Sequence, residues 1–363
     1  MTEPIFRIEM LPAAHGDALL VEYGVGETRR MMIDGGPLRA YDDIARRLDA
    51  LPERGVELLV VTHVDTDHVE GVIRMLAAEK RNWLVRPREV WFNGWRHLST
   101  QTLGGREGEF MGALLRLRLP DRWNTRFDGN AVCVDPAAPR RVPLEGGMTL
   151  TLLSPDAGQL LKLREHWKAN CEKWNLPTGR LKAALEQLAS ERKFSAGLGN
   201  LGPDDLTPEL LAEIKRTDRA VANGSSIAFL AEFGGKSCLF LADAHMGVVC
   251  DSLERLGHSK DEPLRVDAVK LSHHGSKRNL TRDFLELVDA QNYLVSTNGD
   301  IHQHPDYEAI EAIISGARRQ PTLWFNYRSP TTVRDWEARS HLVGAKFSTR
   351  YPLPGSAGIV VNL

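Results

Sequence analysis

The stretch Val60-Val-Thr-His63-Val-Asp65-Thr-Asp67-His68-Val-Glu-Gly71 decides how the rest of this sequence is interpreted. An apolar run of strand length leads directly into a loop with two histidines and two aspartates within six positions. Ionisable groups packed so closely are costly to bury unless a cation compensates for their lost hydration. Imidazole and carboxylate groups suit zinc, and the carboxylate share also suits manganese or magnesium. We therefore predict a site for two divalent metal ions; the alternative is a loop of solvated charges.

Further polar segments follow this cluster or precede it in a definite order: Ala14-His15-Gly16-Asp17-Ala18, Ile33-Asp34-Gly35-Gly36, Asn223-Gly-Ser225-Ser226, Leu241-Ala242-Asp243-Ala244, Leu271-Ser-His273-His274-Gly275-Ser276 and His304-Pro305. Together they resemble the metallo-β-lactamase superfamily, whose loop pattern is HxHxDH. Asp65 replaces the middle histidine, which makes the chain similar to the soluble hydrolase domain of the competence protein ComEC and its stand-alone relatives. The resemblance implies a mixed α/β (α+β) fold, a four-layer αββα sandwich of the metallo-β-lactamase type.

Apolar patterning along the chain is consistent with a layered α/β fold. Strand-sized runs lie at 5–10, 18–23, 30–33, 58–62, 89–92, 148–153, 226–232, 237–241, 266–271, 293–296 and 358–363. Helical spacing occurs at 41–51, 281–288 and 310–314. Between 157 and 222 leucines recur at helical spacing with few β-branched residues, including segments around 207–214. We predict one domain over residues 1–363, with a helical insertion at 157–222.

Composition excludes several classes of protein. The 46 Lys+Arg and 48 Asp+Glu residues give a net charge of -2, without the general basic excess of a protein that coats nucleic acid or a membrane. Four scattered cysteines exclude a disulfide framework, and the sequence shows neither a secretory leader nor an apolar run of about 20 residues. The sequence shows no GxSxG elbow, no P-loop and no GxGxxG pattern that opens a predicted helix. We expect a cytoplasmic protein without a membrane association.

The resemblance implies seven candidate metal ligands: His63, Asp65, Asp67, His68, Asp243, His273 and His274. His63 and Asp65 would hold one ion, and Asp67 and His68 would hold the other. Asp243, at the end of a predicted strand, would bridge both ions. Adjacent side chains leave a strand in different directions, so one of His273 and His274 would be a ligand and the other a neighbour of the substrate. We favour His274.

Other polar residues are candidates for supporting roles. Asp34 would orient a ligand histidine, although an aspartate before two glycines is also typical of a turn. Asn223 stands where many relatives carry a third histidine ligand; it would either approach the metal or fix the turn before its strand. The remaining candidates for contact with the metals or substrate are His15, Asp17, Ser276, Lys277, His302 and His304. A turn without a functional role is the alternative for His15 and Asp17, and capping of the next helix is the alternative for His302 and His304.

The predicted activity is hydrolysis by a metal-bound hydroxide, with Asp67 orienting the nucleophile and His304 or His302 donating a hydrogen bond to substrate or leaving group. Between residues 80 and 141 there are 12 Lys+Arg against six Asp+Glu, interleaved with four tryptophans, which suits phosphate contact and base stacking. The alternative is a solvated basic face over tryptophans that belong to the core. The ComEC resemblance implies a phosphodiesterase or nuclease acting on DNA or nucleotides, in a host-defence setting. Alternatives are a lactonase or other carboxylic-ester hydrolase, and a non-catalytic binding module. The helical insertion would be a lid, a surface for a protein partner, or a homodimer contact.

Overall fold

A computed structural model describes residues 3–98, 106–137, 139–174, 176–194 and 219–363. Its strands are β1 (Ile5–Met10), β2 (Leu19–Gly24), β3 (Arg29–Ile33), β4 (Gly55–Val60), β5 (Arg86–Trp91), β6 (Arg141–Pro143), β7 (Thr149–Ser154), β8 (Ala228–Phe233), β9 (Lys236–Phe240), β10 (Leu264–Lys270), β11 (Val288–Val295), β12 (Thr322–Phe325), β13 (Ser348–Arg350) and β14 (Ile359–Asn362). Its α-helices are α1 (Tyr41–Asp49), α2 (Thr66–Ala77), α3 (Arg106–Arg118), α4 (Ala157–Lys173), α5 (Leu181–Ser190), α7 (Arg219–Gly224), α8 (Met246–Arg255), α9 (Arg282–Leu287), α10 (Tyr307–Gly316), α11 (Pro330–Val333) and α12 (Trp336–Ser340). No helix in these ranges is both long and apolar enough to span a lipid bilayer.

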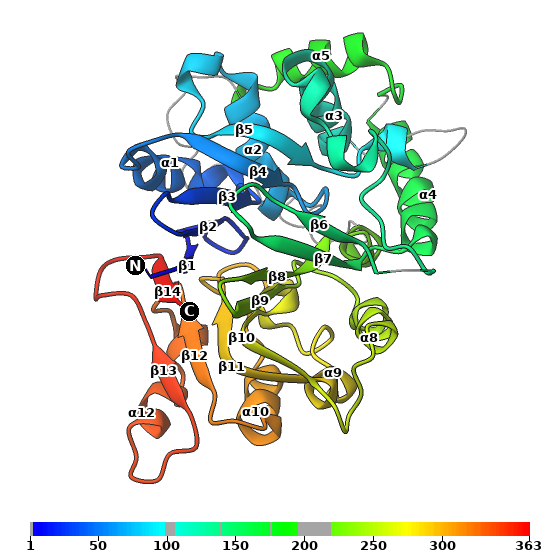
Figure 1. The fold of residues 1–363 in the computed structure, drawn as a ribbon. Helices are drawn as coiled ribbons and strands as arrows, with labels where there is room; N and C mark the ends of the chain where they lie inside the picture. Colours follow the sequence, from blue (N-terminus) through cyan, green and yellow to red (C-terminus); the bar gives the residue numbers. More distant parts are fainter. Residues whose placement is uncertain (1–2, 99–105, 138, 175, 195–218) are drawn as a thin grey trace.

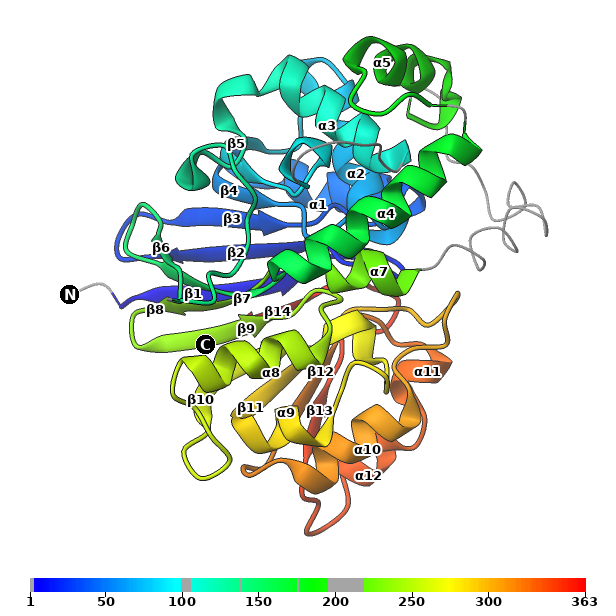
Figure 2. The ribbon, with the colours of Figure 1, turned by 90° about the vertical axis from the view of Figure 1, so that its right-hand side faces the viewer.

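Two sheets face each other in the middle of the molecule. The first has the order β14-β1-β2-β3-β4-β5, and the second has the order β13-β12-β11-β10-β9-β8-β7-β6. Helices α1, α2 and α3 cover the outer face of the first sheet, and α8, α9 and α10 cover the outer face of the second (Figure 1; Figure 2). The fold is therefore the four-layer αββα sandwich that the sequence predicts.

Three apolar cores separate the four layers. Leu20, Leu59 and Val72 belong to a core between the first sheet and its helices. A second core, with Val21 and Phe229, lies between the two sheets, and a third packs the second sheet against α8, α9 and α10. Residues of one strand enter different cores because successive side chains point to opposite faces. Each sheet is thus buried on both faces, as layered α/β folds require.

Each sheet contains parallel strands, whose carboxyl ends lie at the same edge of that sheet. In the first sheet β3 pairs with β4 and β4 with β5 in parallel, and in the second sheet β9, β10, β11, β12 and β13 are mutually parallel. The carboxyl ends of parallel strands meet at the same sheet edge, where loops gather polar side chains. The loop after β4 and the loops after β9 and β10 carry the polar motifs.

Most strands found in the structure overlap the runs expected from sequence. The β8–β9 hairpin is confirmed: Gly234 and Gly235 form its two-residue turn at φ +59° and +77°, a conformation that glycine adopts without strain. The predicted start of the strand at Tyr293 was wrong, because β11 begins at Val288, directly after α9. Helices α3 and α8 were not expected. The buried residues of α3 show little helical periodicity because this helix is covered on more than one side.

Helices α4 and α5 lie within the range predicted as a helical insertion. Leu163, Trp167 and Leu188 from this segment join the core that also holds α2 and α3. The expected helices around residues 207–214 lie outside the described residues. Figure 2 shows α4 running along the side of the molecule from α5 toward α7.

A buried carboxyl group lies under this helical cover. Glu109 of α3 accepts a hydrogen bond from the backbone N of Gly179 at 2.9 Å, and its Oε1 atom has no hydrogen-bond partner among the described residues. Burial raises the pKa of Glu109 to about 7, although the Gly179 hydrogen bond and Arg116 oppose the shift. Glu109 is therefore neutral in mildly acidic solution and ionised in basic solution.

We expect Glu109→Gln to stabilise the protein at pH 8 but not at pH 4. The pKa of a glutamate rises on folding here, so the unfolded chain loses its proton first and stability falls as pH increases from about 4.5 to about 7. The ionised form costs about 2–3 kcal/mol of unfolding free energy above pH 7. Urea unfolding at both pH values would measure the difference. Glu107→Gln, on the same helix, is the matched control and should show no such pH dependence; an unchanged pH 8 stability of Glu109→Gln would contradict the prediction.

Candidate metal centre

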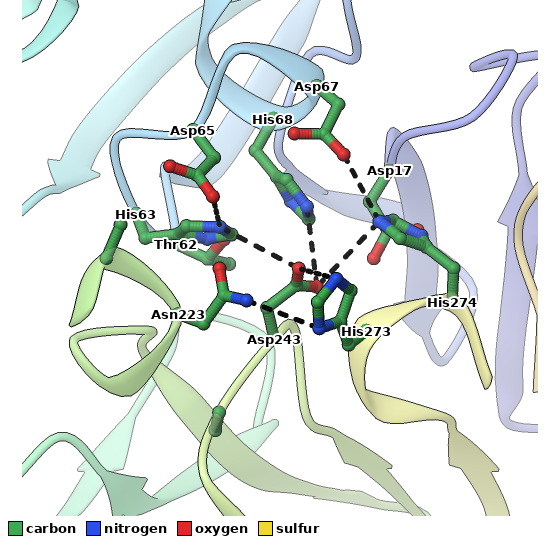
Figure 3. A network of polar contacts seen from close by, with 12 residues as sticks. Asp17, Thr62, His63, Asp65, Asp67, His68, Asn223, Asp243, His273 and His274 are labelled. Atoms are coloured by element: carbon green, nitrogen blue, oxygen red, sulfur yellow. Dashed lines mark hydrogen bonds and ion pairs between the residues drawn. The ribbon is translucent and has the colours of Figure 1, made fainter. Parts of the chain in front are cut away.

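The polar motifs meet where loops from both sheets converge. The loop between β4 and α2 supplies His63, Asp65, Asp67 and His68, and the segments after β9 and β10 supply Asp243 and the pair His273 and His274 (Figure 3). Two groups of side chains could each hold a metal ion: His63, His68 and Asp243, and Asp67, His68 and His274. All five of these residues are buried, although they come from segments more than 200 residues apart.

Asp243 lies at the centre of the cluster. Its Oδ1 atom is 3.4 Å from His68 Nε2 and 3.9 Å from His274 Nε2. Its Oδ2 atom is 4.0 Å from His63 Nε2 and 3.8 Å from His273 Nε2. The two oxygens thus face different sets of histidines, which is the geometry needed by a carboxylate that bridges two ions.

Backbone conformation contributes to this convergence. Ala242, His273 and His274 have φ values of +46°, +47° and +55°. Non-glycine residues in this region are strained by about 1 kcal/mol or more and concentrate at functional sites. The short helix η8 (Ser272–Gly275) holds the histidine pair in this conformation, so that the two rings approach Asp243 from different directions.

Each of three buried histidines has its Nδ1 atom occupied by a neighbour. Thr62 Oγ1 is 3.0 Å from His63 Nδ1. Asp34 Oδ2 is 2.8 Å from His68 Nδ1, and the carbonyl oxygen of Ser296 is 2.9 Å from His274 Nδ1. A proton on Nδ1 leaves the Nε2 lone pair available to a metal, which is the usual arrangement of histidine ligands.

Asp34 connects two of these contacts. One of its oxygens accepts from the backbone N of Thr62 at 2.8 Å, and the other accepts from Thr62 Oγ1 at 2.7 Å and faces the His68 ring. Its backbone adopts φ +59°. Asp34 is fully buried and makes the contact with a ligand histidine that the resemblance implies.

Unpartnered buried atoms test whether metal ions fit the site. Four atoms of the cluster are buried without a hydrogen-bond partner among the described residues: His63 Nε2, His68 Nε2, His274 Nε2 and Asp243 Oδ1. Unsatisfied buried polar atoms cost about 1–3 kcal/mol each, and charged ones cost more. Imidazole nitrogens and carboxylate oxygens around one space are the donor set of divalent metals. The residues present fit two such ions.

The pKa values of the cluster residues also indicate that cations fit the site. Burial alone would raise the pKa of Asp243, yet the charges of His273, His68 and His274 hold that pKa well below its usual range. Burial would lower the pKa of His274, but Asp243 and Asp17 raise it to about 9. Without metal, protons on the imidazoles compensate the carboxylates; metal ions would take the place of these protons.

A buried ion pair lies behind His274. Lys270, at the end of β10, is completely buried, and its Nζ atom donates to Asp17 Oδ2 at 2.7 Å and to the carbonyl oxygen of Leu271 at 3.1 Å. The other oxygen of Asp17 lies 3.5 Å from His274 Nδ1. Lys270 was not among the residues selected from sequence. A lysine ending an apolar strand immediately before the histidine pair was the available signal.

His273 and Asn223 lie on the side of the cluster away from His274. His273 Nδ1 is 3.2 Å from both Asn223 Nδ2 and Asn279 Oδ1. Besides this contact with His273, the backbone carbonyl oxygen of Asn223 accepts from the backbone N of Ser226 at 3.0 Å. Asn223 therefore contacts a cluster residue and holds the turn before β8, so both roles considered for it are compatible with the structure.

The other selected residues differ in their relation to the cluster. His15, His302 and His304 form a chain of neighbouring rings that reaches the cluster at His273, with the His304 and His273 ring centroids 5.3 Å apart. Ser276 is buried just after the histidine pair. Lys277 is directed elsewhere, because its Nζ atom pairs with Glu308 at 2.7 Å on the surface.

Three of the four tryptophans of the basic stretch are not accessible for base stacking. Trp83, Trp91 and Trp123 are buried in the apolar cores, so the stacking role was wrong for these three and the alternative of core tryptophans is confirmed for them. Five arginines of the stretch pair with carboxylates and are partly neutralised: Arg81 with Glu79, Arg88 with Glu57, Arg106 with Glu191, Arg126 with Glu89 and Arg141 with Glu232. The local excess of basic residues is therefore smaller in effect than the sequence count.

Metal ions should stabilise the fold. At a free zinc or manganese concentration about 1,000 times the Kd, binding adds about 4 kcal/mol to the free energy of unfolding, which corresponds to a rise of about 5 °C in Tm for a chain of this size. Differential scanning fluorimetry of chelator-treated protein, with and without added metal, would measure it. The same titration of a His68→Ala variant is the control. An unchanged Tm of the parent protein under saturating metal would contradict the prediction.

Comparison with known proteins concerns the fold. Neither a protein-family model nor a curated protein matches the chain. Among solved structures, the metallo-β-lactamase fold protein YhfI from Bacillus subtilis is similar at 10% identity and a TM-score of 0.42, over 99% of this chain and 100% of that chain. A mutant of the CmlA β-hydroxylase is similar at 12% identity and a TM-score of 0.40, over 100% of this chain but 54% of that chain, so this chain spans about half of its length. A metallo-β-lactamase from Cronobacter sakazakii with a HARLDQ motif matches at 13% identity and a TM-score of 0.31, over 76% and 80% of the two chains.

Proposed function

We propose that this protein is a dinuclear metal-dependent hydrolase that cleaves phosphodiester bonds in DNA or nucleotides. The observation that carries the proposal is the position of Asp243 between two groups of buried histidines and carboxylates whose unpartnered atoms face one another. His63 and Asp65 would hold one ion with Asp243. The second ion would be held by Asp243 together with Asp67, His68 and His274.

Divalent ions in such a site lower the pKa of water and neutralise charge that develops on a phosphoryl group. The chain supplies the positioning. Burial would raise the pKa of Asp67, but the neighbouring histidines, His274 first, hold it well below its usual range, so Asp67 is an ionised acceptor for a proton of the attacking water. Its Oδ2 atom is 3.5 Å from His274 Nε2, which fixes its direction.

His304 would contact the substrate as a neutral group. Burial, and then the positive charges of His273 and His274, lower the pKa of His304 to about 3. A neutral imidazole donates a hydrogen bond without adding charge. In this proposal His304 therefore donates a hydrogen bond to the substrate or leaving-group oxygen and does not deliver a proton as a charged acid.

The phosphodiester substrate is supported by the carboxylate-rich ligand set. Asp65 and Asp67 both follow β4, and Asp65 stands where the common superfamily pattern has histidine. A site that contains several carboxylates suits manganese and magnesium better than a site made of imidazoles alone. These two ions often serve phosphoryl transfer. This departure is also the one shared with ComEC-type hydrolases, which supports a nuclease and a nucleic acid or nucleotide partner.

A substrate panel would test the proposal. We expect the manganese- or zinc-loaded protein to cleave bis(p-nitrophenyl) phosphate and DNA, and Asp67→Asn to reduce the rate about 10²–10³-fold because the water loses its ionised acceptor. Asp267→Asn, a surface carboxylate on β10 paired with Lys236, is the control and should cleave at the parent rate. Hydrolysis of an acyl-lactone without cleavage of either phosphodiester would replace the proposed substrate. A fully active Asp67→Asn variant would show that the site is misplaced.

A further inference from the structure

A row of polar side chains runs from the protein surface to the metal cluster. We call it the histidine row: Arg39, His15, His302, His304 and His273. Ring centroids are 6.3 Å apart between His15 and His302, 5.9 Å between His302 and His304, and 5.3 Å between His304 and His273. The row contains residues from both halves of the sandwich, and its outer end, Arg39, was not among the residues selected from sequence.

The contact between Arg39 and His15 determines where the His15 ring carries its proton. Arg39 belongs to the short helix η1 (Leu38–Ala40), and its Nη2 atom lies 2.8 Å from His15 Nδ1. A guanidinium group is a donor only and does not lose its proton in proteins. His15 Nδ1 must therefore accept, which leaves the single proton of a neutral ring on Nε2.

The surroundings of His15 keep the ring neutral. The side chain is buried, and burial, with the adjacent charge of Arg39, lowers the pKa of His15 to about 3 although Asp67 opposes the shift. A ring whose Nδ1 atom accepts from a guanidinium carries a single proton and is therefore neutral. It can offer one N–H group to an acceptor without changing the charge of the site.

The loop that carries His15 is packed against the loop of the metal ligands. Asp17 N donates to the carbonyl oxygen of Asp67 at 3.2 Å. A Cβ atom at Gly16 would lie 1.9 Å from the same carbonyl oxygen, so only glycine permits this approach. The backbone of this loop is therefore held against Asp67, and the charges of Asp67 and His274 both act on the His15 ring.

Arg39 is itself held in place from the other half of the molecule. Its Nη2 atom is 3.4 Å from Asp300 Oδ2, and Asp300 accepts a hydrogen bond from Asn298 Nδ2 at 2.7 Å. The backbone N of Asn298 donates to the carbonyl oxygen of Ala14 at 2.8 Å. The guanidinium, the His15 loop and the loop at 298–302 therefore form one connected unit.

We propose that Arg39 is a positioning residue that fixes His15 as a neutral imidazole protonated on Nε2, and that this N–H group donates a hydrogen bond to a phosphoryl oxygen bound beside Asp67. The second half of the proposal rests on the proposed phosphodiester substrate. The first half concerns only residues of this chain and can be read in the metal-free protein.

Long-range ¹H–¹⁵N NMR of the metal-free protein tests the first half, because nitrogen shifts distinguish the two tautomers. We expect the Nε2-protonated form alone in the parent, a mixture in Arg39→Met, and recovery in Arg39→Lys, which keeps a cationic donor. Arg47→Met is the matched control: Arg47 is similarly exposed, pairs with Glu9, and should leave the His15 signals unchanged. A His15 ring protonated on Nδ1 in the parent, or an Arg39→Met spectrum identical to that of the parent, would overturn the proposal.

Calorimetric binding of inorganic phosphate to the zinc-loaded protein tests the second half. We expect His15→Ala to weaken phosphate binding about tenfold, the contribution of one good hydrogen bond, and His15→Gln, which retains an N–H donor, to recover part of it. Equal affinities of the parent and His15→Ala would overturn the donor role. If the parent itself neither binds phosphate nor cleaves phosphodiesters, the proposed function fails and the donor role fails with it, while the tautomer remains as measured.

Discussion

Replacing Asp243 by asparagine should remove at least one of the two metal ions and lower phosphodiester hydrolysis by about 10³-fold. The two oxygens of Asp243 face different pairs of histidines: Oδ1 is 3.4 Å from His68 Nε2 and 3.9 Å from His274 Nε2, and Oδ2 is 4.0 Å from His63 Nε2 and 3.8 Å from His273 Nε2. An amide of the same size keeps the shape of the side chain but removes the charge that offsets two cations. The loss of several kcal/mol of charge stabilisation corresponds to a rate change of this order.

The measurement is metal content per chain after dialysis, combined with initial rates on bis(p-nitrophenyl) phosphate. Asp289→Asn is the matched control, because Asp289 is also buried but pairs with Arg319 at the start of β11, away from the cluster. That variant should retain the metal content and rate of the parent even if its stability falls. An Asp243→Asn protein that binds two ions and cleaves at the parent rate would refute the bridging assignment.

Lys270→Met is expected to reduce the free energy of unfolding by about 3–5 kcal/mol, the usual effect of removing one partner from a buried ion pair. Lys270 and Asp17 are both almost completely buried and lie 2.7 Å apart. Without the lysine, the Asp17 carboxylate would remain in the interior without its main partner. Burial would raise the pKa of Asp17, but Lys270 and then His274 hold it below its usual range, which shows how strongly the aspartate depends on this cation.

Urea unfolding of the metal-free protein measures this effect separately from metal binding. Lys236→Met provides the control, since Lys236 forms a surface pair with Asp267 and should contribute less than about 1 kcal/mol. A second variant, Asp17→Asn with Lys270→Met, removes both charges and should recover most of the lost stability. If Lys270→Met alone is as stable as Lys236→Met, the buried pair does not have the role assigned to it here.

The polar motifs could be selected from the sequence because their chemistry is local. Two histidines and two aspartates beside an apolar strand have few explanations other than a metal site. The order of the other motifs along the chain then indicated the αββα sandwich. The strand boundaries followed from alternating apolar runs and from turn residues such as Gly234 and Gly235. These signals are carried by neighbouring residues, so no knowledge of the tertiary structure is needed to find them.

Residues whose meaning depends on distant neighbours were missed or misread. The partners of Lys270 and Arg39 could not be identified from neighbouring residues, because Asp17 lies 253 positions from Lys270 and His15 lies 24 positions from Arg39. Trp91 and Trp123 suggested an exposed stacking surface, yet both are core residues. Burial is decided by which layers cover a strand or loop, and that information is spread over the entire chain.

The sequence by itself determined the class of chemistry: an imidazole and carboxylate cluster at the end of a strand, in an αββα chain. Only the tertiary structure decided how the members of that cluster face one another. The positive φ angles at His273 and His274 turn their rings toward Asp243, and the Nδ1 contacts with Asp34 and Ser296 direct His68 and His274 Nε2 inward. Orientation of this kind depends on hydrogen bonds between segments that meet only after the two sheets have packed together.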